Sequence, residues 1–354
     1  MKRPLSTGLL LQWSVVAVTL LYSASLPVTT NDLHIYLAMG RWMFEHGALL
    51  ESEVFTWTAP GSPFLNGTWG FSVAAYQLHR LTGLDGLRLF NGACVALAVL
   101  GTMQAAKARG ASQRAVALAG LVAWILVLQN TVVRGQTWAF PLFAALMWLA
   151  ARPRPTWLAL ASGATLGALW ANLHGSFPAG VAYLGALTIG GWQDGHSRTP
   201  ALLALGLAVG ACINPYGLGL WGYVLDNSSL PLQRDFVEWY PPDPESFEGL
   251  RLFAAIGLWC LLLPLGRRRP LGHLLVLVGF GLLALGSTRF VAWFGLATVP
   301  GLALRLSEAM GADSGLPGLR KLGLVLLAAW AVFLVKLVQP LEPALHADTP
   351  TALV

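Results

Sequence analysis

The chain has 354 residues, of which 56% are hydrophobic and only 11% are charged. Soluble domains carry about 25% charged residues, so this composition excludes an ordinary soluble domain. The apolar residues occur in runs along the whole chain, a pattern typical of a polytopic α-helical membrane protein. The net charge of +6 does not indicate a nucleic-acid partner, because the basic residues form short clusters between the apolar runs.

The apolar runs predict about eleven membrane-spanning helices. They lie near 8–26, 86–106, 115–130, 136–150, 156–171, 176–192, 200–213, 249–265, 271–286, 288–304 and 321–338. Several runs are shorter than the ~20 residues that a straight span needs, which leaves their boundaries loose. Residues 69–81 are too short to cross, so we expect a helix in the membrane interface there. We predict an all-α integral membrane protein with one domain over 1–340 and a short polar tail over 341–354.

Lysine and arginine are enriched on the cytoplasmic side of membrane proteins. An N-terminus inside the cell places most of the 22 basic residues, including the Arg267–Arg269 cluster, in cytoplasmic connections. These connections are short and show nothing else of chemical interest. The two long loops, 27–70 and 214–248, then lie outside, and the unusual polar residues collect on their side. We therefore expect an active or binding face that points away from the cytoplasm.

The first outer loop is the longest polar interruption of the chain. Asn31 and Asp32 follow the first apolar run directly, and an amphipathic stretch over 33–46 comes next. An acidic residue at the mouth of a membrane helix is costly unless it has a partner or a function. Asp32 is therefore a candidate general base, with the alternative that it only caps the helix that follows it.

Other polar residues interrupt the apolar sequence at outer helix ends. Arg134 and Arg289 are candidates for binding a phosphate, because a guanidinium binds phosphate through two hydrogen bonds and stays charged. Alternatively, both side chains reach toward lipid headgroups. His174 would contact the phosphate or the acceptor, or be a hydrogen-bonded structural histidine. The further candidates for substrate contact are Asn31, Asn172, Gln136, Glu238 and Trp239. A tryptophan at this place is also typical of an interfacial anchor.

The first loop resembles that of the GT-C glycosyltransferases. These multi-span enzymes include protein O-mannosyltransferases and the aminoarabinose transferase of lipid A, and they use polyprenyl-phosphate sugars. The similarity is greater to a bacterial GT-C-like group, whose loop pattern is present here as Asp32, Gly40-Arg41-Trp42, Phe55-Thr56-Trp57-Thr58-Ala59-Pro60-Gly61 and Trp69. Two later stretches, NLHG at 172–175 and NPYG at 214–217, are similar to later motifs of that group.

The resemblance implies a GT-C-like fold in a bacterial inner membrane. It implies transfer of a sugar, with inversion, from a polyprenyl-phosphate donor to an acceptor hydroxyl at the extracytoplasmic face, among membrane lipids. In such a transfer a carboxylate takes the acceptor's proton and positive groups stabilise the leaving phosphate, which are roles for Asp32 and the arginines. The sequence shows no metal cluster, phosphate-binding loop or nucleotide motif, so we predict no cofactor. The alternatives are a transporter or flippase, and a catalytically inactive subunit.

Overall fold

The computed structural model describes residues 7–27, 32–192, 195–227, 236–265 and 270–311. Apart from an isolated bridge between Ser52 and Pro63 in the first loop, regular structure in these ranges is helical. The α-helices are α1 (Thr7–Ser25), α2 (Asp32–His46), α3 (Trp69–Ala108), α4 (Gln113–Val127), α5 (Gly135–Leu149), α6 (Thr156–Leu173), α7 (Pro178–Gly190), α8 (Arg198–Gly210), α9 (Gly219–Asn227), α10 (Phe247–Leu262), α11 (Leu271–Gly286) and α12 (Val291–Met310). The short 3-10 helices include η1 (Leu128–Asn130), η3 (Val237–Trp239), η4 (Leu263–Leu265) and η5 (Thr288–Phe290).

The apolar runs and the observed helices agree closely. Each predicted span up to residue 304 coincides with a helix, while 321–338, the tail 341–354 and Arg267–Arg269 lie outside the described residues. Three segments, Thr7–Ser25, Trp69–Ala108 and Thr288–Met310, are long and apolar enough to cross a membrane, and α4, α7, α8 and α11 are shorter apolar helices. The chain is therefore a helical membrane protein, and the number of eleven spans stays a prediction.

The region 69–81 is a helix, as predicted, and its position in the membrane interface stays a prediction. It forms the first part of α3, and the predicted span forms the second part, as far as Ala108. Within α3, Gly83 leaves helical geometry with φ 69° and ψ −168°. This backbone region is open to glycine and strained for residues with a side chain. The two parts are therefore separated by a kink and not by a loop.

Aromatic side chains join four helices in the centre of the bundle. Phe143 of α5 lies with its ring centroid 5.9 Å from that of Trp170 of α6 and 5.3 Å from that of Trp293 of α12. The two tryptophan rings stack at 5.7 Å, and Tyr183 of α7 contacts Phe143 at 5.4 Å. All four side chains are buried. Because each buries a large apolar surface, this cluster fixes the helices whose ends carry the polar residues described below.

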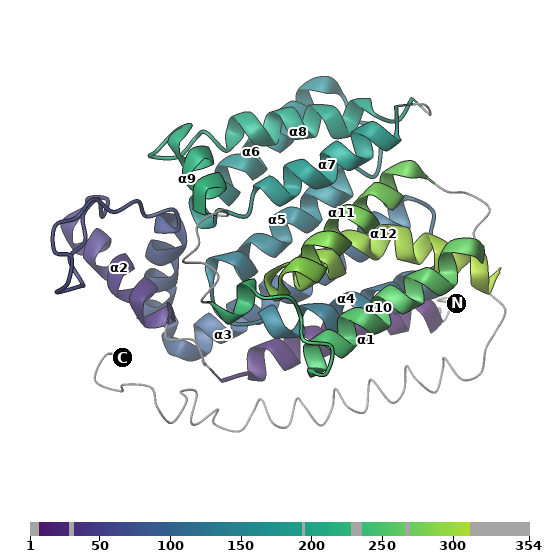
Figure 1. Cartoon of the computed structure of the whole chain (residues 1–354), viewed down its shortest axis with the longest axis horizontal. Coiled ribbons are helices and arrows are strands. Elements are labelled where there is room, and N and C mark those ends of the chain that lie inside the picture. The colour runs from purple at the N-terminus through teal and green to yellow at the C-terminus, as the bar shows by residue number, and fades with distance from the viewer. Residues whose placement is uncertain (1–6, 28–31, 193–194, 228–235, 266–269, 312–354) are drawn as a thin grey trace, which may run out of the picture.

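The amphipathic stretch of the first loop forms α2, which lies at one end of the bundle against α3 (Figure 1). It buries Leu33, Gly40 and Met43 and leaves Arg41 exposed. A Cβ atom at Gly40 would collide with the carbonyl oxygen of Ser72 in α3. Glycine in the Gly-Arg-Trp motif therefore allows the close approach that holds α2 over the end of the bundle.

Candidate active site

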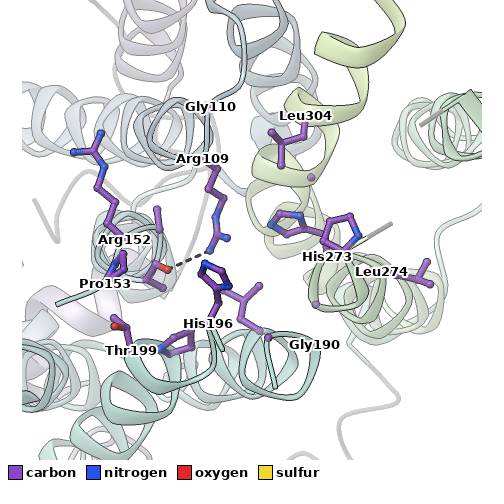
Figure 2. Close-up of a pocket in the computed structure, with 18 of the residues that line it drawn as sticks. Arg109, Gly110, Arg152, Pro153, Gly190, His196, Thr199, His273, Leu274 and Leu304 are labelled. Carbon is purple, nitrogen blue, oxygen red and sulfur yellow. Dashed lines mark hydrogen bonds between the residues drawn. The ribbon is translucent and has the colours of Figure 1, made fainter. Parts of the chain in front are cut away.

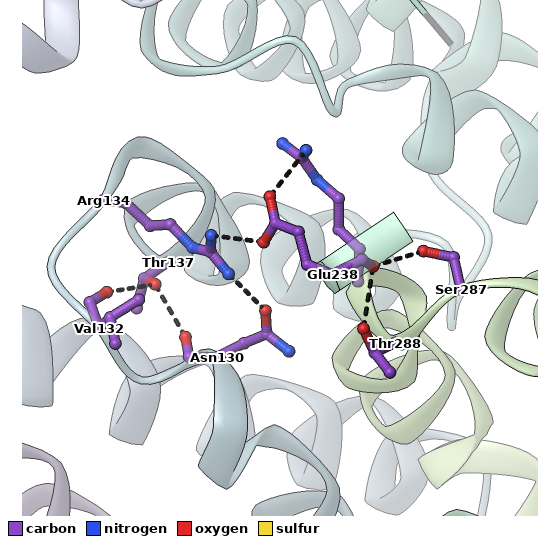
Figure 3. A network of polar contacts seen from close by, with 8 residues as sticks. Asn130, Val132, Arg134, Thr137, Glu238, Ser287 and Thr288 are labelled. Atoms are coloured by element: carbon purple, nitrogen blue, oxygen red, sulfur yellow. Dashed lines mark hydrogen bonds and ion pairs between the residues drawn. The ribbon is translucent and has the colours of Figure 1, made fainter. Parts of the chain in front are cut away.

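One carboxylate and two guanidinium groups meet where three segments of the chain converge. Glu238 accepts a hydrogen bond at Oε2 from Arg134 Nη1 at 2.8 Å and another at Oε1 from Arg289 Nη1 at 3.2 Å (Figure 3). The exposed fractions of the side chains are 35% for Glu238, 16% for Arg134 and 25% for Arg289. We call these three residues the Glu238 cluster. Since they are partly withdrawn from water, their charges interact more strongly than those of surface pairs.

Local hydrogen bonds hold Arg134 in place at the start of α5. Its backbone is extended, with φ −158° and ψ 163°, and it stands immediately before the helix. Its Nη2 donates to Asn130 Oδ1 at 2.8 Å. The hydroxyl of Thr137, in the first turn of α5, is shared between the carbonyl oxygens of Asn130 at 2.9 Å and Val132 at 2.8 Å. These contacts close the turn between η1 and α5, and they direct the guanidinium of Arg134 toward Glu238 (Figure 3).

The junction between α11 and α12 holds the other side of the cluster. The hydroxyls of Ser287 and Thr288 donate to the backbone carbonyl of Glu238 at 2.7 Å and 2.9 Å (Figure 3). Arg289 follows in η5, and its guanidinium lies 4.9 Å from the ring centroid of Trp239. This is a cation–π contact, so Arg289 covers one face of Trp239. The prediction that Trp239 contacts a sugar ring stays untested, and only its other face would be open to one.

The cluster shifts the pKa of its carboxylate. Burial by itself would raise the pKa of Glu238. The positive charges of Arg134 and Arg289, together with the hydrogen bond from Arg134, outweigh burial, so the pKa lies below its ordinary value of 4.5. Glu238 is therefore ionised at neutral pH, and the cluster carries two positive charges against one negative charge. This surplus of positive charge suits a bound anion.

His174 lies beside the cluster as a neutral hydrogen-bond donor. Its Nδ1 accepts the backbone N–H of Ser176 at 3.1 Å, so this nitrogen carries no proton. Burial, and then the charges of Arg289 and Arg134, lower the pKa of His174 well below its ordinary value. The neutral ring consequently has its proton on Nε2. Nδ1 of His174 therefore has a partner inside the protein, Nε2 stays available as a donor, and both interpretations of His174 stay predictions.

Asp32 is the first residue of α2 and is exposed. Within the described part of the chain its carboxylate makes no hydrogen bond or ion pair, and its neighbour Asn31 lies outside the described residues. Tyr36 lies one turn later on α2. Burial and then the negative charge of Asp32 raise the pKa of Tyr36, while Arg134 and Arg289 lower it. The charge of Asp32 also acts on Arg289.

Hydrogen bonds join the sequence motifs to one another. The indole nitrogen of Trp69 donates to Asn172 Oδ1 at 2.8 Å, and Asn172 Nδ2 donates to the carbonyl of Ile213 at 2.8 Å. The backbone N–H of Asn66 donates to the hydroxyl of Tyr216 at 3.1 Å. Both polar atoms of the Asn172 amide therefore have partners inside the protein. Asn172 thus links these motifs, and its predicted contact with substrate stays a prediction.

The side-chain amide of Gln136, unlike that of Asn172, has no partner inside the described part of the protein. Gln136 follows Arg134 by two residues and is fully buried, and neither polar atom of its amide has a hydrogen-bond partner among the described residues. An unpaired buried polar group costs about 1–3 kcal/mol. A polar group of a bound molecule would relieve this cost, so Gln136 stays a candidate for substrate contact.

Sequence reasoning missed two members of the site. Asn130 orients Arg134, and the charges of Asp32, Arg134, Arg289 and Glu238 all act on Tyr36. Tyr36 was accessible from the sequence, because it follows Asp32 by four residues on an amphipathic helix and so shares its face. Asn130 had no such signal. Within the described residues, no group of three or more His, Cys, Asp or Glu side chains is placed to hold a metal ion.

Two solved structures resemble this chain over nearly all of its length. One is the crystal structure of the Archaeoglobus fulgidus oligosaccharyltransferase in the apo form, with a TM-score of 0.56 and 14% sequence identity. The other is the archaeal oligosaccharyltransferase AglB from Archaeoglobus fulgidus in complex with an inhibitory peptide and a dolichol-phosphate, with a TM-score of 0.56 and 13% identity. The chain shares their fold. Each match covers 96% of this chain and 56% of the other.

The oligosaccharyltransferase AglB is a glycosyltransferase of the GT-C fold. The GT-C-like fold implied by the first loop is therefore confirmed, whereas the particular bacterial group stays a prediction. The chain spans just over half of the length of these two structures, and at this level of identity the similarity establishes the fold alone. No protein-family model matches the chain, and the comparison with curated proteins found no match.

Proposed function

We propose that this chain is a GT-C-type glycosyltransferase that takes a sugar from a polyprenyl-phosphate donor at the extracytoplasmic face of the membrane. The observation that supports it best is the convergence of Arg134 and Arg289, from distant parts of the sequence, on Glu238. The charge of Asp32 also acts on Arg289. Two guanidinium groups bind the leaving phosphate, and a carboxylate activates the acceptor. The fold shared with AglB, whose structure holds a dolichol-phosphate, agrees with a lipid-linked phosphate.

The reaction requires one bond to form and one to break at C1 of the sugar. The acceptor's hydroxyl oxygen attacks C1 from the face opposite the phosphate, and its proton passes to Asp32. The bond between C1 and the phosphate oxygen breaks, and the electron pair leaves with the polyprenyl phosphate. Arg134 and Arg289 stabilise the negative charge that develops on this oxygen, and the Nε2 proton of His174 adds a hydrogen bond. Inversion at C1 follows from the single displacement.

Glu238 occupies the place where the donor's phosphate would bind the two arginines. Each guanidinium carries five N–H donors and gives one of them to Glu238. A phosphate can therefore enter by displacing the carboxylate or by using the donors that remain. Before the donor arrives, Glu238 holds the two positive charges together.

The same ion pairs also favour a second function. If Glu238 only ties η3 to the starts of α5 and α12, the cluster is structural and the chain is an inactive GT-C-like subunit. A transporter or flippase of lipid-linked solutes is the remaining alternative from the sequence. A transfer assay separates these functions, because only the enzyme releases polyprenyl phosphate in proportion to the sugar transferred.

The decisive variant is Asp32→Asn, which keeps the shape of the side chain and removes its basicity. The assay supplies purified, reconstituted protein with labelled polyprenyl-phosphate hexoses and pentoses and measures the release of polyprenyl phosphate. We expect turnover to fall by about 10²–10⁴-fold with donor binding retained. The matched control is Glu45→Gln, which removes an exposed acid from the same helix and should leave turnover unchanged. Near-normal turnover by a well-folded Asp32→Asn protein would reject the proposed base.

A further inference from the structure

A separate cavity lies at the opposite ends of the helices that form the Glu238 cluster. Its volume is about 1210 Å³, and residues at the ends of α3, α5, α7, α10 and α12 line it together with the starts of α8 and α11. Arg134 precedes the first residue of α5, whereas Ala150, which follows the last one, lines the cavity. A helix of this length extends about 22 Å. The cavity is therefore distinct from the candidate active site.

The lining of this cavity is strongly basic. Its arginines are Arg109, Arg152, Arg154, Arg198 and Arg305. Glu308 is the only acidic residue among the described residues of the lining, and it is paired with Arg305 at 3.0 Å. The side chain of Arg109 donates a hydrogen bond, at 3.3 Å, to the carbonyl of Ala150 and also interacts with the hydroxyl of Tyr183. The cavity thus concentrates positive charge that the protein does not neutralise within its described residues.

Buried nitrogen atoms without partners distinguish this cavity from a merely basic surface. Both ring nitrogens of His273 are buried and have no hydrogen-bond partner among the described residues, and the same is true of Arg109 Nε. The positive charges of Arg109 and Arg305 both act on His273. Figure 2 shows Arg109 and His273 on different walls of the same opening, with His196 close to the end of Arg109.

The usual enrichment of arginine on the cytoplasmic side explains only part of this arrangement. It accounts for exposed side chains such as Arg152 and Arg198. It does not account for Arg305, which is 7% exposed, or for a histidine whose two buried ring nitrogens lack partners in the described part of the chain. Unpaired buried polar groups are costly, and a ligand that accepts hydrogen bonds would satisfy the ring N–H of His273 and the Nε–H of Arg109. The sequence led us to expect nothing else of chemical interest in these connections, and a binding site there would depart from that expectation.

We propose that this cavity binds a phosphate group, carried either by an anionic lipid headgroup or by a soluble phosphate compound, with Arg109 and His273 as its main contacts. A phosphate offers several acceptor oxygens and a negative charge, which match the buried donors and the basic lining. His273 contributes one ring N–H, and the arginines contribute charge. The proposal does not depend on the glycosyltransferase activity, because none of these residues belongs to the Glu238 cluster.

Two binding measurements on the full chain test the proposal and separate the two sources. In the first, pyrophosphate is titrated by calorimetry into protein in nanodiscs of phosphatidylcholine. In the second, native mass spectrometry compares the retention of phosphatidic acid with that of phosphatidylcholine of the same acyl chains. Binding in the first measurement identifies a soluble phosphate compound as a ligand, and preferential retention of phosphatidic acid identifies a lipid headgroup. Binding of neither would overturn the proposal.

Variants assign any binding to the cavity. We expect Arg109→Gln to weaken binding by at least about tenfold, because a charge-assisted hydrogen bond is lost, and His273→Gln to weaken it by about two- to tenfold. Lys107→Gln is the matched control, since Lys107 is exposed, lies in the same turn of α3 and does not line the cavity. If Arg109→Gln does not fold, His273→Gln alone decides. Equal weakening by Lys107→Gln, or none by the two cavity variants, would contradict the proposal.

Discussion

The substitution Glu238→Gln tests how the two arginines of the candidate site are used. It keeps the size of the side chain and removes the negative charge that both guanidinium groups contact, at 2.8 Å and 3.2 Å. We expect two effects of opposite sign. The protein should become less stable, because ion pairs are lost, and it should bind polyprenyl phosphate more tightly, because the competing carboxylate is gone.

The magnitude of the first effect follows from the geometry. Hydrogen bonds to charged groups contribute about 1.5–3 kcal/mol each, but the Glu238 side chain is 35% exposed, so solvent screening reduces the contribution of each pair. Glutamine also retains one oxygen that accepts a hydrogen bond. The expected loss of stability is therefore roughly 1–2 kcal/mol. If the same free energy is recovered when phosphate replaces the carboxylate, binding tightens by about five- to thirtyfold.

The pH dependence of stability provides a second signature. The pKa of Glu238 is lowered from 4.5 in the folded protein, so the ion pairs contribute stability above pH 4.5, and this contribution is lost as the pH falls through the folded-state pKa. The difference in stability between the wild-type protein and Glu238→Gln should be constant above about pH 5. It should shrink below pH 4.5 and vanish once the carboxyl group of the wild-type protein is protonated.

Thermal unfolding in detergent and native mass spectrometry with polyprenyl phosphate measure the two effects. Glu45→Gln, which removes an exposed acid from α2, is the control and should change neither quantity. If Glu238→Gln lowers stability and also weakens phosphate binding, the carboxylate supports the arginines and does not compete with the ligand. If neither quantity changes, the cluster has no energetic role, and the reasoning from its geometry is refuted.

Two further predictions concern packing and orientation. Gly135→Ala places a Cβ atom 2.5 Å from the Leu173 carbonyl oxygen and should destabilise the protein by about 1–3 kcal/mol. Gly185→Ala, which has free space in α7, should stabilise it by about 0.5–1 kcal/mol. Equal changes in the unfolding temperature of the two variants would contradict the close contact of Gly135 with Leu173. The orientation is tested in a protein without its 3 native cysteines. A membrane-impermeant maleimide should label Trp57→Cys from outside the cell and Lys107→Cys only after lysis. Labelling of both in intact cells would contradict the prediction that the two positions lie on opposite sides of the membrane.

The helices were accessible from the sequence because their determinants are local. Runs of apolar residues marked α1, α3 to α8 and α10 to α12, and an amphipathic pattern marked α2, whereas α9 lies in the region 214–248 that was predicted to be a loop. The region 69–81 was predicted as a separate helix because it is too short to cross a membrane. Its junction with the following span lies at Gly83, whose φ of 69° interrupts the helical geometry of α3. Whether a glycine kinks or terminates a helix is decided by the packing around it, which the sequence does not reveal.

The candidate site was predictable in its members and not in its contacts. Arg134, Glu238 and Arg289 each stood out as charged residues at outer helix ends. Their pairing joins positions 104 and 51 residues apart, and no local pattern encodes such a distance. For the same reason the arginines of the second cavity could be assigned only to a membrane side. The burial of His273 among them emerged from the packing of α11 against α12.

The most direct test of the central claim is the affinity for polyprenyl phosphate, which requires no knowledge of the sugar or the acceptor. The double variant Arg134→Gln with Arg289→Gln should bind it at least about 100-fold more weakly than the wild-type protein, because two charge-assisted contacts are lost. In the double variant Glu238 keeps its charge and has lost both arginine partners, which could itself cause misfolding. A triple variant that adds Glu238→Gln removes this unpaired charge and shows whether misfolding causes the loss of affinity. Arg41→Gln, which removes an exposed charge from α2, should bind as the wild type does. Unchanged affinity in a folded double or triple variant would contradict the claim that these arginines hold the donor's phosphate.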